Sequence, residues 1–154
     1  MKILIVEDDA EQREVLVKAL SYAKIPRKVD TTGFEITVAA SRGSAEKILR
    51  TRDFDFVLLD FYLEDGHSSA EISHELSKKK VPHAFYTADE PLTKTGPVPR
   101  DVPVWPKAAV GVSMDLVTKI CDYYQKFTER ASNPGAETKF FGISLGGLKN
   151  RKAQ

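Results

Sequence analysis

Carboxylates follow two apolar runs of the sequence, at the point where each run stops. The run from Lys2 to Val6 leads directly into Glu7 and Asp8, and the run from Phe56 to Leu59 leads into Asp60. Both runs have the length and composition of buried β-strands. In an open parallel sheet, ligands bind outside the carboxyl ends of the strands. These acids therefore lie where chemistry is expected.

At least three carboxylates converge if the two predicted strands are neighbours. Their mutual repulsion raises their pKa values unless a cation lies among them, and Mg²⁺ is the usual partner of a small group of carboxylate oxygens. One aspartate then remains to act as a nucleophile. An acidic residue after a strand has a simpler interpretation, as the N-cap of the next helix. Asp9, directly before Ala10, could be such a cap.

Two later runs end in side chains that are suited to bind an anion. The run from Pro82 to Tyr86 is followed by Thr87 and the small Ala88, and the run from Val102 to Pro106 is followed by Lys107. Successive strand ends therefore supply an acidic pair, an aspartate, a hydroxyl group and an ammonium group, in that order.

This order of residues resembles the receiver domain of bacterial two-component response regulators, over about residues 1–130. The resemblance implies that Asp60 accepts a phosphoryl group from a histidine kinase or a histidine phosphotransfer protein. It also implies that Asp8 and Asp60 bind Mg²⁺ directly and that Glu7 binds it through a water. The backbone carbonyl of Tyr62 is the remaining protein ligand that the resemblance implies.

The same resemblance implies that Thr87 and Lys107 bind the phosphoryl oxygens and so stabilise the group in transfer. Tyr62 and Ala88 are the positions expected to modulate the chemistry. The Tyr62 side chain is expected near the path of the water that hydrolyses the phosphoaspartate.

Two features near the strand-end lysine depart from the receiver pattern. Receivers usually carry a proline after this lysine, but here Pro106 precedes Lys107 and Ala108 follows it. The usual switch aromatic corresponds to Val104, whereas the aromatic here is Trp105. Adjacent residues of a strand point to opposite faces, so Trp105 is expected to face away from the side that Val104 faces.

The fold expected from this resemblance is an α/β three-layer sandwich with a five-stranded parallel sheet in the flavodoxin-like order 2-1-3-4-5. A capping box of Ser68 with Glu71 is predicted to start the third helix. Other helices are predicted over 10–23, directly after 41–44, and over 113–130.

Three segments are predicted to carry little regular structure. Residues 24–33 are predicted to be a polar surface loop, and residues 88–101 contain three prolines and a glycine, which predict a short or absent fourth helix. A receiver domain is expected over 1–131, followed by a tail over 132–154 that is too short for an effector domain. The tail is expected to be disordered, although its apolar side chains are suited to dock on a partner.

The charge balance and the start of the chain limit the classes of partner. With 23 basic and 22 acidic residues the net charge is +1, which does not favour direct binding of nucleic acid. Met1 leads directly into a strand, and no run approaches the length of a membrane span, so insertion into a membrane is not expected. A cytoplasmic protein is predicted.

The function predicted is that of a stand-alone phosphoacceptor with output through contact with a downstream protein, and not that of an enzyme with a separate substrate. One alternative is a degenerate receiver that binds a partner without being phosphorylated. Another is a phosphatase or phosphotransferase with an aspartate nucleophile. A haloacid-dehalogenase-like site requires a second aspartate two residues after the first, where Tyr62 stands.

Overall fold

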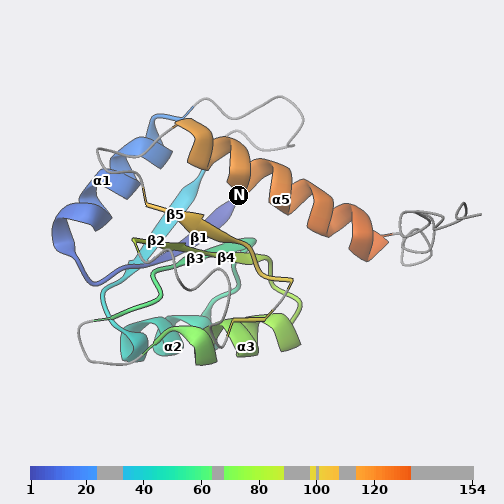
Figure 1. Ribbon diagram of the computed structural model, residues 1–154, viewed down its shortest axis with the longest axis horizontal. Coiled ribbons are helices and arrows are strands. Elements are labelled where there is room, and N and C mark those ends of the chain that lie inside the picture. Colours follow the sequence, from blue (N-terminus) through green and yellow to red (C-terminus); the bar gives the residue numbers. More distant parts are fainter. Residues whose placement is uncertain (24–32, 64–67, 89–97, 100, 108–113, 133–154) are drawn as a thin grey trace, which may run out of the picture.

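The computed structural model describes residues 1–23, 33–63, 68–88, 98–99, 101–107 and 114–132. Strands and helices alternate along these residues (Figure 1). The strands are β1 (Lys2–Val6), β2 (Glu35–Ala39), β3 (Phe56–Leu59), β4 (His83–Thr87) and β5 (Val104–Pro106). The helices are α1 (Ala10–Ser21), α2 (Arg42–Thr51), α3 (Ala70–Lys78) and α5 (Met114–Ser132).

The strands form one parallel sheet in the order β2-β1-β3-β4-β5. The predicted flavodoxin-like order 2-1-3-4-5 is therefore confirmed. β1 pairs with both β2 and β3, and in the second of these pairings Val6 lies opposite Leu59. The residues that follow β1 and β3 consequently emerge side by side at the carboxyl edge of the sheet.

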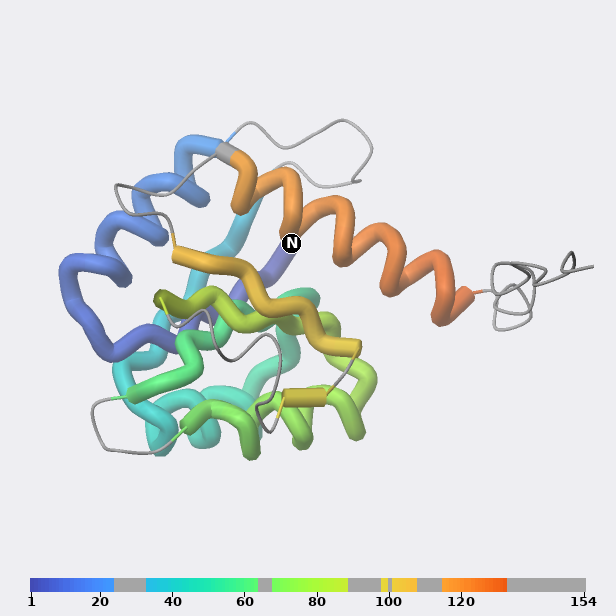
Figure 2. Tube along the Cα trace, viewed as in Figure 1, coloured from blue at the N-terminus to red at the C-terminus, as the bar shows by residue number. Residues whose placement is uncertain are grey.

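Helices cover both faces of the sheet and complete a three-layer sandwich (Figures 1 and 2). α1 and α5 lie on one face, and α2 and α3 lie on the other. Alternate strand residues point to opposite faces. In β1, Leu4 packs in the core under α2 and α3, whereas Ile3 and Ile5 pack in the core under α1 and α5. The sheet thus divides the apolar interior into two cores.

The predicted capping box at the start of α3 is wrong. The N-cap is Ser69 in place of Ser68, and its side chain makes no capping hydrogen bond. The Ser69 hydroxyl donates to the carbonyl oxygen of Asp60, and Glu71 forms an ion pair with Arg42 of α2. Both side chains are therefore engaged in tertiary contacts. A capping box is present at α2, where Ser41 and Ser44 bond to each other's backbone N–H.

α3 ends in a Schellman motif. The backbone N–H of Lys80 donates to the carbonyl of Ser77 at 3.1 Å, and that of Val81 donates to the carbonyl of Leu76 at 2.9 Å. Lys80 has φ 56°, in the left-handed region that glycine adopts most readily. Leu76 is buried in the core under α2 and α3, and Val81 packs against it.

The ends of three elements differ slightly from the prediction. α1 ends at Ser21, and α5 continues to Ser132. β5 begins at Val104 and not at Val102, because the backbone N–H of Val102 donates to the carbonyl of Pro99 at 3.1 Å and closes a turn before the strand.

Several predicted features lie outside the described residues. These are nearly all of the loop over 24–33, the greater part of the segment in which the fourth helix was expected to be short or absent, and the tail beyond Ser132. Within the described part of the chain, no helix combines the length and the apolar character needed to cross a membrane.

Candidate functional site

The carboxylates of Glu7, Asp8 and Asp60 lie together at the carboxyl edge of the sheet. One oxygen from each of them can be chosen so that all three lie within 4.8 Å of one another. Backbone hydrogen bonds continue past the strands and set this arrangement: the Asp60 N–H donates to the carbonyl of Val6 at 2.8 Å, and the Glu7 N–H donates to the carbonyl of Ala39 at 3.0 Å. The parallel register therefore brings the predicted acids together.

Lys107 joins the acidic cluster from the end of β5. Its ammonium nitrogen donates to Glu7 Oε2 at 2.8 Å and to Asp60 Oδ2 at 2.7 Å. The backbone N–H of Lys107 donates to the carbonyl of Thr87 at 2.9 Å, which keeps the end of β5 beside β4. The Lys107 side chain is 9% exposed, so both ion pairs lie in partly desolvated surroundings.

The pKa values of Glu7 and Lys107 reflect these surroundings. Burial of Glu7, which is 1% exposed, is the largest cause that raises its pKa. The hydrogen bond from Lys107 opposes this rise and the charge of Asp60 adds to it, so that the pKa is about 7. Burial alone lowers the pKa of Lys107, but the carboxylates of Asp60 and Glu7 outweigh burial and raise it. Lys107 therefore stays cationic and supplies the positive charge of the cluster.

Both the side chain and the main chain of Asp60 are held by neighbours. Asp60 Oδ1 accepts the backbone N–H of Phe61 at 2.7 Å, and the carbonyl of Asp60 accepts the Ser69 hydroxyl. The Ser69 N–H donates to the carbonyl of Phe61 at 2.9 Å, and Ser69 is fully buried. The start of α3 is thus bonded to the end of β3. Sequence reasoning missed Ser69, because a serine directly before a helix indicates a cap.

Arg13 is a second residue that sequence reasoning missed. From α1, its Nη1 donates to the carbonyl oxygens of Glu7 at 2.7 Å and Asp8 at 2.6 Å, and so fixes the turn between β1 and α1. Because the guanidinium group binds main-chain carbonyls, no pattern of residue types marked this contact. Asp9 caps α1 by accepting the N–H of Gln12 at 2.9 Å, as its simpler interpretation predicted.

The remaining predicted residues lie at or near the same edge of the sheet. Thr87 ends β4 and is 3% exposed, and Ala88 after it is exposed. The Tyr62 side chain is 55% exposed, and its ring meets the ring of Phe61 edge-on with 4.9 Å between the centroids. Tyr62 therefore presents an aromatic ring to solvent close in sequence to Asp60.

Trp105 faces the core under α1 and α5, whereas Val104 packs against the other core. The predicted opposite orientation is thus confirmed. The Trp105 ring stacks on Phe56 with an interplanar angle of 3° and meets the Tyr123 ring of α5 edge-on. Trp105 is therefore placed to report on the packing between β5 and α5, next to the strand end that carries Lys107.

The donor set at the sheet edge fits a hard divalent cation. Glu7 Oε1 is buried and, among the described residues, has no hydrogen-bond partner. A buried carboxylate oxygen without a partner is costly, and a cation or a water bound to it satisfies that oxygen. Mg²⁺ commonly binds to one or two carboxylates and keeps several waters. Asp8 and Asp60 provide such carboxylates beside Glu7.

No protein-family model matches the sequence, and no curated protein is significantly similar to it. Solved structures share its fold. The N-terminal domain of a response regulator/sensory box/GGDEF three-domain protein from Carboxydothermus hydrogenoformans has a TM-score of 0.64 at 20% identity, over 86% of this chain and 99% of that chain. A CheY-like response regulator receiver domain protein from Methanospirillum hungatei also has a TM-score of 0.64 at 20% identity, over 84% and 97%. The chain has the receiver-domain fold.

A third receiver-fold structure is that of the response regulator protein TrrA from Thermotoga maritima, in complex with Mg²⁺ and BeF. Its TM-score is 0.60 at 23% identity, over 80% of this chain and 97% of that chain. At such identities the likeness concerns the fold. On the receiver fold of the present chain, the acidic cluster and Lys107 lie together at the carboxyl edge of the sheet.

Proposed function

We propose that the protein acts as a response-regulator receiver in which Asp60 accepts a phosphoryl group from a histidine kinase or a histidine phosphotransfer protein. The observation that carries this proposal is the placement of Asp60 within one cluster with Glu7, Asp8 and Lys107 on a receiver fold. A phosphoacceptor requires a carboxylate nucleophile together with positive charge for the phosphoryl oxygens, and this cluster contains the nucleophile and the ammonium group.

Asp60 is the proposed nucleophile. A carboxylate oxygen of Asp60 attacks the phosphorus atom in line with the bond to the donor's imidazole nitrogen. The new P–O bond forms as the P–N bond breaks, and the imidazole nitrogen keeps the electron pair and takes a proton. The bonds from Phe61 and Ser69 hold Asp60 in place for this attack, which limits the reorganisation that the step requires.

Lys107 and Thr87 are the proposed ligands of the phosphoryl oxygens. Lys107 already donates to Asp60 Oδ2, so its ammonium group is placed to pair with a phosphoryl oxygen on that side chain. The Thr87 hydroxyl is proposed to donate to a second phosphoryl oxygen from the end of β4. Tyr62 and Ala88 are proposed to modulate the access of water and the space around the phosphoryl group.

The residues proposed to hold Mg²⁺ are Asp8 and Asp60 directly, Glu7 through a water, and Tyr62 through its backbone carbonyl. When bound, the ion neutralises negative charge on the phosphoryl oxygens. Arg13 supports this set by fixing the main chain of Glu7 and Asp8. Its guanidinium group donates to their main-chain carbonyl oxygens and so holds the turn that carries both carboxylates.

The proposed output is contact with a downstream protein in the cytoplasm. The nearly equal numbers of basic and acidic residues do not favour direct binding of nucleic acid. The receiver fold is that of a signalling phosphoacceptor, and we propose no reaction on a separate substrate.

Incubation with Mg²⁺ and acetyl phosphate tests the proposal. Intact-protein mass spectrometry should show one added phosphoryl group in the native chain and in Asp9→Asn, whose carboxylate caps α1, but none in Asp60→Asn. Mg²⁺ with beryllofluoride should change the fluorescence of Trp105 in the same two proteins and leave that of Asp60→Asn unchanged.

Labelling of Asp60→Asn at the native rate would refute Asp60 as the acceptor. If neither reagent acts on the native chain while its fold is intact, the protein is instead a receiver that binds its partner without phosphorylation. Chelation of Mg²⁺ should abolish labelling, and labelling without any divalent ion would exclude the proposed metal requirement.

A further inference from the structure

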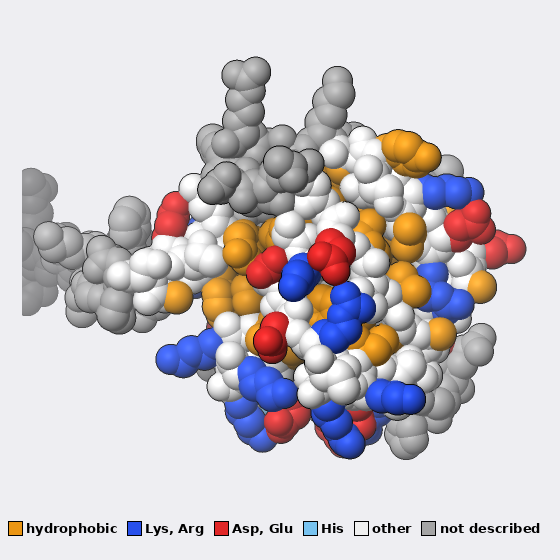
Figure 3. Space-filling view, turned by 180° about the vertical axis from the view of Figure 1, so that it is seen from behind, with side chains coloured by type: hydrophobic (Ala, Val, Ile, Leu, Met, Phe, Trp, Pro, Cys, Tyr) orange, Lys and Arg blue, Asp and Glu red, His pale blue; other side chains and the backbone are white. Residues whose placement is uncertain are grey.

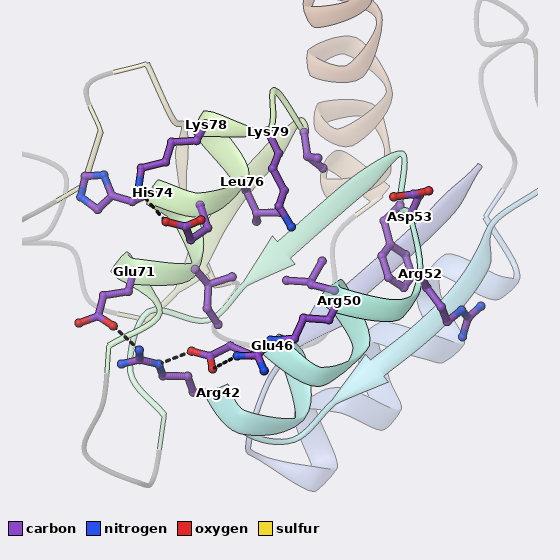
Figure 4. Close-up of a pocket in the computed structure, with 15 residues that line it drawn as sticks. Arg42, Glu46, Arg50, Arg52, Asp53, Glu71, His74, Leu76, Lys78 and Lys79 are labelled. Carbon is purple, nitrogen blue, oxygen red and sulfur yellow. Dashed lines mark hydrogen bonds and ion pairs between the residues drawn. The ribbon is translucent and has the colours of Figure 1, made fainter.

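A groove separates α2 from α3 on the face of the sheet opposite α1 and α5. Its volume is about 780 Å³, within the range of pockets that bind sizeable ligands. Side chains from both helices project into the space between them (Figure 4). Neighbouring helices usually interdigitate with their axes about 8–10 Å apart. α2 and α3 therefore leave a groove between them where neighbouring helices commonly pack against each other.

The groove has an apolar floor. Leu49 of α2 and Ile72 and Leu76 of α3 line it, together with Phe54 and Val81. Leu49 and Val81 are only half-buried, although both pack against the core beneath them. Apolar side chains from another molecule would remove this exposed surface from water, which is favourable.

Ion pairs bridge one end of the groove. Arg42 at the start of α2 forms an ion pair with Glu71 of α3 and another with Glu46 at 2.8 Å. Arg42, Glu46 and Glu71 all line the groove. The charges of the two acids are therefore already balanced by Arg42. This end offers little attraction to a further charged partner.

The groove also carries two cations whose charges are less well balanced. Arg50 of α2 is 78% exposed, and its ion pair with Glu46 spans 3.9 Å. Lys79 lies at the C-cap of α3, is exposed, and forms no ion pair with the described residues, although its charge helps to lower the pKa of the lining residue Glu75. Seen from behind, several Lys and Arg side chains, with Asp and Glu side chains among them, lie along the lower margin of the molecule, over the layer of α2 and α3 (Figure 3). Positive charge thus flanks the apolar floor from both helices.

We propose that this groove binds a helical segment of a partner protein that is apolar on one face and acidic along the edges of that face. The apolar face would lie on Leu49, Ile72 and Leu76, and acidic side chains would reach Arg50 and Lys79. Such binding is the helix-in-groove mode of recognition. α2 contains 10 residues and is therefore about 15 Å long, which matches about three turns of a bound helix. This surface does not depend on the phosphoacceptor chemistry.

A labelled acidic peptide tests the groove. The probe is a fluorescein-labelled amphipathic peptide of about 14 residues, with leucines on one helical face and glutamates beside them. Fluorescence anisotropy with the full chain should show saturable binding, weakened about tenfold or more by Arg50→Glu with Lys79→Glu. A peptide with lysines in place of the glutamates should prefer that variant to the native chain.

Lys47→Glu is the matched control, because Lys47 is an exposed lysine of α2 that does not line the groove. Its affinity for the acidic peptide should stay within about threefold of the native value. Circular dichroism checks the fold of each variant, and Lys79→Gln supplies a milder change. Failure of the acidic peptide to bind, or an equal loss in Lys47→Glu, overturns the proposal.

Two other occupants are distinguished by further measurements, and either of them overturns the proposal. Sedimentation that shows a dimer of the native chain, dissociated by Arg50→Glu with Lys79→Glu, assigns the groove to a second copy. A rise of about tenfold in peptide affinity after Phe140→Ser with Phe141→Ser assigns it to the chain's own C-terminal residues.

Discussion

Lys107 is the positive charge that Glu7 and Asp60 share. Lys107→Ala leaves two carboxylates facing each other without that charge, and it also removes a hydrogen-bond donor from each of them. We expect the free energy of unfolding to fall by roughly 1–3 kcal/mol in the presence of a chelator, because buried acceptors lose their partner. Urea denaturation measures this loss, and added Mg²⁺ should recover part of it.

Lys119→Ala is the control for this prediction. Lys119 forms an ion pair with Asp115 along α5 and is 38% exposed, so its removal should change stability little. Losses of equal size in the two variants would show that the Lys107 contacts contribute no more than a surface ion pair.

Tyr62 is the residue expected to protect the phosphoaspartate. Tyr62→Asn removes an aromatic ring close in sequence to Asp60, which gives water better access to the phosphoryl group. We expect a shorter phosphoryl lifetime, by up to about 100-fold, since a small misplacement of a reacting water has effects of that size. Loss of label over time, followed by intact mass, measures the lifetime.

Tyr22→Asn is the control for the lifetime measurement, because Tyr22 is 86% exposed at the end of α1. It should leave the lifetime unchanged. An unchanged or longer lifetime in Tyr62→Asn would show that the Tyr62 ring does not hinder water.

The positions of the site residues could be predicted because the direction of a parallel strand determines where its last residue lies. Glu7, Asp60 and Lys107 were found in this way. The double contact of Lys107 could not be predicted, because it depends on side-chain conformations across three strands. Arg13 and Ser69 act on backbone carbonyls, and no pattern of residue types marks such partners.

At the scale of the elements, the left-handed residue after α3 yields a stability prediction. Lys80→Gly removes the conflict between Cβ and the backbone at φ 56°, and we expect the free energy of unfolding to rise by about 1 kcal/mol. Lys79→Gly should lower it, because Lys79 has the right-handed conformation, with φ −79° and ψ −3°. Urea denaturation of both variants provides the measurement. Changes of the same sign would contradict the assignment of the strain to Lys80.

Strands were easier to predict than helix starts. The runs at β1 and β3 are continuously apolar because both faces of the sheet are covered, so their limits are sharp. The start of α3 was predicted wrongly because Ser69 and Glu71 bind distant groups, and these contacts outweigh the local capping pattern.

At the scale of the whole molecule, His83 makes stability depend on pH. Burial lowers its pKa, while the hydrogen bond with the Val81 carbonyl and the charge of Asp101 oppose the shift; the imidazole also bonds to Ser73. The unfolded chain therefore takes up the proton first, near the ordinary histidine pKa of 6.5. Stability is full above that pH and falls as the pH drops below it, by at most about 1.4 kcal/mol per pH unit.

The difference between the native chain and His83→Gln isolates this contribution from other titrating groups. Between about pH 7 and pH 5, the stability of His83→Gln should fall less steeply than that of the native chain. His74→Gln alters an exposed histidine and should keep the native slope. Equal slopes in all three proteins would show that His83 takes up its proton equally well in the folded state.

The order of the strands followed from the resemblance, but the groove between α2 and α3 could not be read from the sequence. Leu49, Ile72 and Leu76 have the spacing of core residues, and they do pack on the sheet. The distance between the two helices depends on how each of them lies on that sheet. The spacing of apolar residues in the sequence contains no information about that distance. Two helices with an open groove between them and two helices in contact therefore show the same spacing.

The two contacts of Lys107 also bear on how the protein is made. The positive charge that pairs with Glu7 and Asp60 belongs to Lys107, which directly follows β5 in the same chain. A newly synthesised chain therefore needs no external cation to supply this charge. We therefore expect the fold to be completed without a metal ion. For the response regulator proposed above, folded protein would then be present before any phosphodonor acts on it.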